Sequence, residues 1–347
     1  MTASEVVPGQ VNVRGARQAE MEALRVLCEA DPLFARRYEG WAALGSGENA
    51  AVVSARRRGS GVGVALKVYW CGAALGADDA RGEAAALARV AHPCVVRVYG
   101  TFEDQAPLAW IEMEPVDGVT LADALRERAA VGTGAWPLAA ALEIGACVAE
   151  GLAAVHAAGF AHRDLKPGNV LLPRNGRPAA KLADFGVARS LDATRRLHEE
   201  RAGNPKYASP ESARGEHVGC EGDVYALGLV LYELVSGGLF PFPAGQGTTA
   251  VEMLESHRRR APVPLRGLGL GLPDELVDLI HRALDKRPER RPSAAELAVR
   301  LRALRVGEGE PSPGCTPGRR AAAVLALGLG VAMGLAMVLT LLWIFFA

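Results

Sequence analysis

The sequence predicts an α+β protein built from two lobes and followed by one membrane-spanning helix. Short apolar runs interrupted by glycine dominate residues 38–114, which favours a small antiparallel β-sheet lobe with one main helix. Long apolar segments with helical spacing dominate residues 117–304, which favours a larger helical lobe. An uncharged run over residues 321–346 is long enough to cross a bilayer.

Composition is that of a folded protein and gives no sign of a nucleic-acid partner. Half of the 347 residues are apolar, which is enough to bury a substantial core. The 39 basic residues balance the 39 acidic ones, so the excess positive charge that attracts phosphate backbones is missing and we expect no nucleic acid to bind. No apolar stretch follows a basic start at the N-terminus, so no secretory signal is expected.

The six cysteines are scattered and never fall at C-x-x-C spacing. They are Cys28, Cys71, Cys94, Cys147, Cys220 and Cys315. This spacing argues against a zinc site or a redox motif, and it suits a reducing compartment. We therefore expect the bulk of the chain to be cytoplasmic.

Residues 1–37 are expected to form an N-terminal extension. Apolar residues recur at roughly helical spacing between Arg17 and Glu29, which predicts an amphipathic helix there. The pair Asp31-Pro32 is expected to end that helix, because proline restricts the residue before it to extended conformations.

The small lobe over residues 38–114 is expected to hold five strands. They are Trp41–Leu44, Ala50–Ala55, Val62–Tyr69, Val95–Phe102 and Leu108–Met113. A helix is expected from about Asp78 to Val90, between the third strand and the fourth.

The large lobe is expected to be mostly helical from Leu121 onward. Its longest apolar-periodic segments are Leu138–Ala157, Asp223–Ser236, Pro273–Leu284 and Ser293–Leu304. Residues 305–320 contain several prolines and glutamates, so we expect a linker there.

Residues 321–346 predict a single transmembrane helix, since the run exceeds the roughly 20 residues that a bilayer core requires. A buried core helix is the alternative, but soluble core helices rarely stay apolar on every face for this length. Arg319 and Arg320 precede the run, so the positive-inside rule places both lobes in the cytoplasm of a single-pass membrane protein. The chain ends directly after the run, so no sensor domain is expected on the far side. Gly330 and Gly334 have the spacing of helix-pairing motifs, which leaves dimerisation open.

A glycine-rich turn joins the first two expected strands. It reads Leu-Gly-Ser-Gly-Glu-Asn-Ala-Ala-Val over residues 44–52, and Gly45 and Gly47 allow backbone amides to approach phosphate oxygens. Taken alone, such a turn is also typical of an ordinary hairpin.

A lysine follows at the end of the next apolar run. Lys67 comes after Val-Ala-Leu in the third expected strand, where a charged group is costly unless it meets an anion. Glu83 lies on the expected helix that follows, and a carboxylate there is able to orient Lys67. Read singly, Lys67 is a snorkelling edge lysine and Glu83 a solvated helix residue.

Two later segments carry the groups that phosphoryl transfer requires. The first reads His-Arg-Asp-Leu-Lys-Pro-Gly-Asn over residues 162–169, and the second reads Lys-Leu-Ala-Asp-Phe-Gly over residues 181–186. Transfer from a metal nucleotide builds charge on three equatorial oxygens, so it needs positioned cations and a group that orients the attacking hydroxyl. Two acids, an amide and a lysine at this spacing rarely arise by chance.

At these residues the chain resembles the eukaryotic-like (Hanks-type) serine/threonine protein kinases that bacteria use for signalling, from about Tyr38 to Leu304. The resemblance implies the two-lobed protein kinase fold, ATP with Mg²⁺ (or Mn²⁺), and serine or threonine hydroxyls of proteins as substrates. It implies that Asp164 is the catalytic base and that Lys166 stabilises the transferring phosphoryl group. Asn169, a third catalytic residue, and Asp184 would hold the metal.

The resemblance also implies a set of nucleotide-binding residues. Lys67 and Glu83 would form the ion pair that positions ATP. The glycine-rich turn and the strands beside it would cover the nucleotide through Gly45, Gly47, Val52 and Ala65. The gatekeeper and the hinge that recognises adenine would be Met113, Glu114 and Val116.

Three further residues are implied to be structural. Glu211 would pair with Arg291, and Asp223 would brace the catalytic segment from beneath. Lys166 indicates serine/threonine rather than tyrosine specificity.

Two residues depart from the family pattern. Ala50 replaces the third glycine of the turn, which is expected to stiffen it. Asn204 stands where these kinases usually place a threonine that hydrogen-bonds the catalytic acid and lysine. Since asparagine both donates and accepts, we expect that contact in an altered geometry.

Thr194 lies among arginines between Phe185 and Pro210, which bound the expected activation segment. Its phosphate would dock on Arg163 and order the segment, whereas a segment ordered without phosphate is the equal alternative.

Two other classes of protein share parts of this pattern. A pseudokinase scaffold on the membrane would lack one of Lys67, Asp164 and Asp184, and all three are present. A small-molecule phosphotransferase of similar fold would generally lack Lys166 and a peptide-positioning segment like residues 203–211. We therefore expect an active protein kinase, with autophosphorylation between neighbouring copies as one activity.

Overall fold

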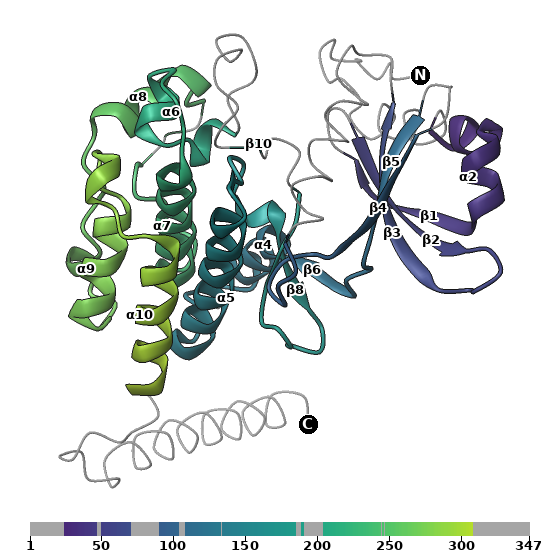
Figure 1. Cartoon of the computed structure of the whole chain (residues 1–347). Coiled ribbons are helices and arrows are strands. Elements are labelled where there is room, and N and C mark those ends of the chain that lie inside the picture. The colour runs from purple at the N-terminus through teal and green to yellow at the C-terminus, as the bar shows by residue number, and fades with distance from the viewer. Residues whose placement is uncertain are drawn as a thin grey trace, which may run out of the picture. The chain divides into compact units, whose positions relative to one another are not determined.

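A five-stranded antiparallel sheet forms the small lobe of the computed structural model (Figure 1). Its strands are β1 (Tyr38–Ser46), β2 (Ala50–Arg57), β3 (Gly63–Trp70), β4 (Val98–Glu103) and β5 (Leu108–Met113). They lie in the order β1-β2-β3-β5-β4. All five expected strands are present: β5 coincides with its expected range, and the other four have somewhat different ends.

The structure describes residues 24–46, 50–70, 90–103, 108–132, 134–184, 189–190, 204–243, 245 and 247–307. The expected membrane helix over residues 321–346 lies outside them, as does the expected helix from Asp78 apart from Val90, which is not helical.

The alternation of side chains along β3 decides where Lys67 points. Val64, Leu66 and Val68 pack into a core with Phe34 and Trp110 on one face of the sheet. Residues at odd positions point to the opposite face, because successive strand side chains alternate. Lys67 is therefore turned away from this apolar core, which a lysine could enter only at high cost.

The described part of the N-terminal extension, residues 24–37, contains two helical stretches, whereas a single helix was expected from Arg17 to Glu29. Residues 24–30 are helical, and a second helix, α2 (Pro32–Arg37), begins directly after Asp31. The Asp31 carboxylate accepts hydrogen bonds from the backbone amides of Leu33 and Phe34, both at 2.9 Å. Asp-Pro therefore ends the first helix and also starts the next, with aspartate as N-cap and proline at the first helical position.

The large lobe is mostly helical, as expected. Its helices are α4 (Leu121–Val131), α5 (Leu138–Ala157), α6 (Pro210–Ala213), α7 (Cys220–Ser236), α8 (Ala250–Arg259), α9 (Asp274–Ala283) and α10 (Ala294–Gly307). Short strands are β6 (Gly118–Thr120), β7 (Phe160–Ala161), β8 (Val170–Pro173), β9 (Lys181–Leu182) and β10 (Arg189–Ser190). Single 3-10 turns are η1 (Pro167–Asn169), η2 (Pro205–Tyr207), η3 (Leu265–Leu268) and η4 (Pro288–Arg290).

Helix α5 is the centre of the large lobe, and its residues coincide with the expected segment Leu138–Ala157. It packs against α7 (Figure 1). It also lies beside β9. Within the described ranges it is the one helix that is long and apolar enough to cross a membrane by length and composition. Its side chains belong to the main apolar core, which accounts for that composition without a bilayer.

The last helix differs from expectation at its end. Helix α10 continues to Gly307, so the first three residues of the expected linker over residues 305–320 are helical. Arg305 is a good helix former, which favours extension past Leu304, and the helix ends at Gly307, a residue type common at helix ends.

Candidate active site

The residues of the first motif lie on the segment between β7 and β8, where three polar side chains converge. The Lys166 ammonium donates to Asp164 Oδ2 at 2.5 Å. The Asn169 side-chain nitrogen donates to the Asp164 carbonyl oxygen at 2.8 Å and to Asp164 Oδ2 at 3.0 Å. Asp164 is therefore held by an ammonium group and an amide group on one side, while its side chain stays 16% exposed.

A buried carboxylate braces this segment from beneath. Asp223 of α7 is 1% exposed and accepts hydrogen bonds from the backbone amides of His162 and Arg163, both at 2.7 Å. Arg163 has a φ of 64°, a conformation that is strained for a residue with a side chain. The two hydrogen bonds hold the backbone in this conformation. They thereby set the direction in which the Asp164 side chain projects from the backbone.

His156 of α5 completes the brace, and the sequence did not point to it. Its Nε2 lies 2.8 Å from Asp223 Oδ2. Burial opposes a charge on His156, but the hydrogen bonds and negative charges of Asp223 and Cys220 together outweigh burial and raise the pKa of His156 to about 9. Burial likewise opposes the Asp223 charge, and the hydrogen bond with His156 and the backbone amide of His162 nevertheless keep the pKa of that carboxyl below its usual value.

Asp184 of the second motif meets the lysine of β3. Lys67 Nζ lies 2.5 Å from Asp184 Oδ1, and Lys67 itself is 7% exposed. The backbone amide of Ala183 donates to the carbonyl oxygen of Asn169 at 2.9 Å. Asp184 is the next residue, so this hydrogen bond holds its backbone near Asn169. Asp184 has a φ of 61°, a second strained backbone position beside the same site.

Asn169 and Asp184 fit a hard divalent cation. The hydrogen bonds of the Asn169 side chain to Asp164 use its amide nitrogen, which leaves its oxygen as a ligand. The Asp184 side chain is 44% exposed and supplies a carboxylate. An amide oxygen beside a carboxylate is the donor set that Mg²⁺ prefers, usually completed by waters and phosphate oxygens.

The other expected nucleotide-binding residues of the small lobe lie on neighbouring strands. Val52 of β2 pairs with both Gly45 and Lys67, and Ala65 of β3 pairs with Met113 at the end of β5. Ala65 and Lys67 share one face of the sheet because they are two positions apart. The structure thus brings these residues together around Lys67.

The segment after β5 joins the two lobes. The Glu114 carboxylate accepts from Lys181 Nζ at 2.6 Å and from the Arg97 amide at 2.9 Å, and the Glu114 amide donates to the Arg97 carbonyl at 2.9 Å. Glu114, Val116 and Lys181 line a cavity of about 410 Å³. Lys181 holds the Glu114 side chain in place, and no sequence pattern predicted this pair.

Glu211 and Arg291 form the expected ion pair. Two parallel hydrogen bonds join the guanidinium to the carboxylate at 2.7 and 2.8 Å, and the side chains are 4% and 0% exposed. Burial opposes the charge of Glu211, but the hydrogen bonds from Arg291 hold the pKa of its carboxyl below the usual value. The pair anchors α6 to the segment after η4.

Asn204 makes a different contact from the expected one. Its side-chain oxygen accepts from the Lys206 amide at 3.0 Å, and it is the N-cap of η2. The described contacts of Asn204 do not include Asp164 or Lys166. Asparagine favours this local contact, because its short side chain readily accepts a hydrogen bond from the backbone amide two residues later.

Three expected residues cannot be placed in this arrangement. Gly47, Glu83 and Thr194 lie outside the described residues.

Comparison with known proteins agrees with this geometry. The family model described as protein kinase domain matches residues 38–300. Over 270 residues the chain is 34% identical to a probable serine/threonine-protein kinase of Clostridium perfringens, an alignment that covers 76% of this chain and 37% of that protein.

Two other relatives are similar at comparable levels. The chain is 38% identical over 237 residues to serine/threonine-protein kinase PknB of Mycolicibacterium smegmatis, covering 66% of this chain and 36% of the relative. It is 41% identical over 230 residues to serine/threonine-protein kinase PkaA of Streptomyces coelicolor, covering 65% and 40%. The chain therefore spans about two fifths or less of the length of these curated relatives. Since the family match extends over residues 38–300, this chain belongs to the protein kinase domain family.

Proposed function

We propose that this chain is an ATP- and Mg²⁺-dependent serine/threonine protein kinase that transfers the γ-phosphoryl group of ATP to protein hydroxyls. The observation that carries the proposal is the convergence of Lys166 and Asn169 on Asp164, beside the contact of Lys67 with Asp184. The relatives are named serine/threonine-protein kinases, which supports the same hydroxyl class.

The side chains of the catalytic segment have separable roles in this proposal. Asp164 orients the substrate hydroxyl and accepts its proton as the hydroxyl attacks. Lys166, bonded to the same carboxylate, offers its charge to the phosphoryl group as negative charge develops on it. Asp223 keeps this segment in place through the His162 and Arg163 amides, so it is a positioning residue.

The remaining residues bind and orient the nucleotide. Asn169 and Asp184 hold Mg²⁺, which neutralises charge on the phosphate oxygens when bound. Lys67 lies between the sheet and Asp184, where it orients the phosphates, and Glu83 is proposed as its second carboxylate partner. Gly45, Gly47, Val52 and Ala65 cover the nucleotide, and Met113, Glu114 and Val116 form the hinge.

The test compares the full chain in detergent with two variants. Wild type, Asp164→Asn and the control Asp117→Asn are incubated with Mg²⁺, γ-labelled ATP and a basic protein. Asp117 is 83% exposed and pairs with Arg174 at the surface, so its variant should match wild type. Asp164→Asn should lose about 100- to 10,000-fold in rate, the range for removal of a general base. Phosphoserine or phosphothreonine should be the products in the active proteins.

Retained nucleotide binding without transfer in all three proteins would contradict the proposal. The pseudokinase reading would then replace it, and the chain would be a scaffold.

We also propose that residues 321–346 anchor the kinase to the membrane, with both lobes in the cytoplasm. The length and apolar character of the run support this proposal. The full chain expressed in bacteria should remain in the membrane fraction after an alkaline wash, and a chain lacking residues 321–346 should not. Release of the full chain by high salt alone would contradict an inserted helix, because salt removes proteins held only by charge.

A further inference from the structure

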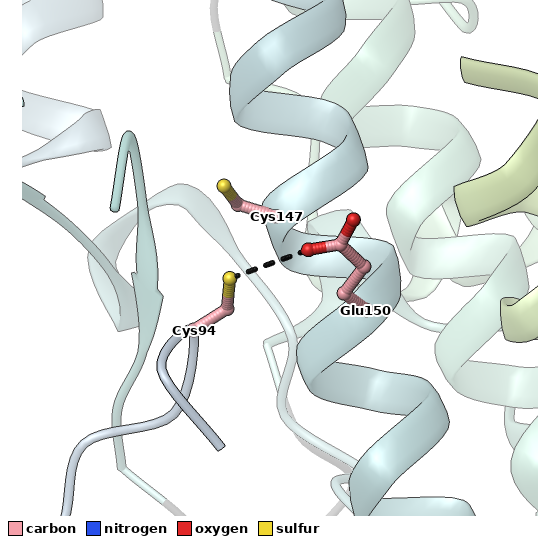
Figure 2. A group of neighbouring side chains, drawn as sticks. All are labelled: Cys94, Cys147 and Glu150. Atoms are coloured by element: carbon pink, nitrogen blue, oxygen red, sulfur yellow. Dashed lines mark hydrogen bonds between the residues drawn. The ribbon is translucent and has the colours of Figure 1, made fainter. Parts of the chain in front are cut away.

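Two cysteines meet a carboxylate where the segment before β4 approaches α5, as Figure 2 shows. Cys94 lies on the segment before β4, whereas Cys147 and Glu150 project from α5. The two sulfur atoms and one Glu150 oxygen lie within 4.8 Å of one another. The Cys94 thiol donates to Glu150 Oε2 across 3.6 Å. The expectation that the cysteine spacing argues against a zinc site or a redox motif considered only sequence spacing, which does not detect cysteines that are brought together by folding.

The two sulfurs are buried but differ in their electrostatic surroundings. Cys94 is 3% exposed and Cys147 is 1% exposed. A hydrogen bond from the Cys94 thiol outweighs burial at Cys147, and together with Arg302 it lowers the pKa of Cys147 to about 6. The same hydrogen bond and burial raise the pKa of Cys94. The surroundings of Cys147 therefore favour the thiolate, and those of Cys94 favour the protonated thiol.

Arg302 of α10 places a permanent positive charge beside Cys147 and Glu150. Its guanidinium donates to the Cys147 sulfur at 3.6 Å and to the two Glu150 oxygens at 2.7 and 3.0 Å. Cysteine and carboxylate are also ligands of soft metals such as zinc. Here a permanent cation already faces two of the three ligand atoms and would repel a metal ion. The charge arrangement favours a stabilised thiolate over a metal site.

We propose that Cys94 and Cys147 are an oxidisable pair that a peroxide converts into an intramolecular disulfide. The Cys147 thiolate attacks one peroxide oxygen and becomes a sulfenic acid, while the O–O bond breaks and the leaving oxygen takes up a proton. The Cys94 sulfur then attacks the Cys147 sulfur as its own proton passes to Glu150. The hydroxide leaving Cys147 takes that proton and departs as water. Two thiols and one peroxide thus give one disulfide, one water and one alcohol, or a second water from hydrogen peroxide.

The position of Cys94 connects this pair to the proposed active site. The Cys94 carbonyl accepts from the Leu182 amide at 2.8 Å, and the Val96 amide donates to the Leu182 carbonyl at 2.8 Å. Leu182 ends β9, two residues before Asp184. A disulfide requires its sulfurs about 2 Å apart, so its formation draws the Cys94 segment toward α5 and displaces β9. This consequence rests on the proposed kinase function, and oxidation should then lower phosphoryl transfer several-fold.

The disulfide is tested directly by mass spectrometry on the full chain in detergent. The folded, reduced protein is treated with hydrogen peroxide, unfolded in an excess of alkylating reagent and digested without reduction. The expected product is one linked peptide pair containing Cys94 and Cys147, which disappears after reduction with dithiothreitol. Cys28 is the internal control, because it is as buried as Cys147 but burial raises its pKa to about 12, which keeps its thiol protonated. It should be alkylated in full.

Matched variants separate the disulfide from its effect on activity. Cys147→Ala should abolish both the linked peptide and the peroxide sensitivity of phosphoryl transfer, whereas Cys28→Ala should retain both. Full alkylation of Cys94 and Cys147 after peroxide would overturn the proposal, as would sulfinic acid at Cys147 without a link. Stoichiometric zinc that shields both thiols until it is chelated would also overturn it in favour of a metal site. The linked peptide is read without any kinase assay, so failure of the proposed function and failure of this proposal are distinguishable.

Discussion

Lys67 Nζ and Asp184 Oδ1 lie 2.5 Å apart although 117 positions separate the two residues in the chain. The contact joins the central strand of the small lobe to the segment after β9 of the large lobe. A cation from one lobe and an anion from the other therefore meet where the phosphates of a bound nucleotide are proposed to lie. Because Lys67 is nearly fully buried, water screens this contact less than it screens an ion pair between two exposed side chains.

Replacing Lys67 with methionine should impair phosphoryl transfer while leaving the fold intact. The variant keeps the apolar stem but removes the charge that orients the phosphates, and loss of one such group costs about 100- to 1,000-fold in rate. Steady-state kinetics with varied ATP measure the loss. Arg58→Met is the control, because Arg58 pairs with exposed Glu39 in the same lobe. Equal loss in both variants would show that general damage to the small lobe is responsible.

Replacing Glu211 with glutamine should destabilise the large lobe strongly. The change leaves the buried Arg291 guanidinium without its carboxylate, and breaking a buried ion pair in this way costs about 3–5 kcal/mol. Denaturant unfolding followed by tryptophan fluorescence measures the free energy of unfolding.

The control for that change is the exposed pair between Arg300 and Glu296, whose nitrogen and oxygen lie 3.3 Å apart. Arg300→Met should change the free energy of unfolding by less than about 1 kcal/mol, because exposed pairs contribute little. A Glu211→Gln variant as stable as the control would contradict the structural role of the buried pair.

The His156–Asp223 pair should make stability depend on pH above neutrality. The pKa of His156 is raised from 6.5 to about 9 in the folded chain, so charged His156 contributes fully below pH 6.5. That contribution is lost as the pH rises from 6.5 through about 9. His156→Gln should flatten this part of the stability profile, measured by thermal unfolding at a series of pH values.

His257 is the matched control for the pH experiment. Burial, with the nearby charge of Lys286, lowers the pKa of His257 to about 4, so it is neutral on both sides of the window used for His156. His257→Gln should alter stability but retain the wild-type slope at alkaline pH. An unchanged slope in His156→Gln would show that another group titrates there.

Adding a methyl group at Gly151 should destabilise the contact between α5 and the Cys94 segment. A Cβ atom there would lie 2.9 Å from the Cys94 carbonyl oxygen and 2.8 Å from Leu182 Cδ1. The backbone must shift to relieve the first contact, and overpacking of this kind costs about 1–3 kcal/mol. We expect Gly151→Ala to lower the melting temperature by several degrees.

Gly267→Ala is the control for this substitution, because a Cβ at Gly267 meets nothing within 4 Å. It should leave the melting temperature nearly unchanged or slightly raised. A Gly151→Ala variant as stable as wild type would show that the Cys94 segment shifts at little cost in free energy. That result would argue against the proposed coupling of this segment to β9.

Local sequence alone determined several parts of this protein. Helix α5 matches its expected segment at both ends. A long apolar run with helical spacing is typical of a buried helix and is too long for a single strand. The five strands were recoverable because glycine and apolar runs alternate along the small lobe. Asp164, Lys166 and Asn169 were recoverable because one short segment carries them all, so tertiary structure has little freedom to separate them.

Tertiary structure decided the contacts between distant residues. Helix α2 was missed because Asp31-Pro32 is compatible both with a helix end and with a helix start, and the burial of Phe34 against the sheet selects the start. His156 was missed because a single histidine on an apolar helix has no signature until α7 brings Asp223 within 2.8 Å. The sequence therefore determined which chemical groups this chain carries, and only packing decided which of them meet, because side-chain interactions act over a few ångströms.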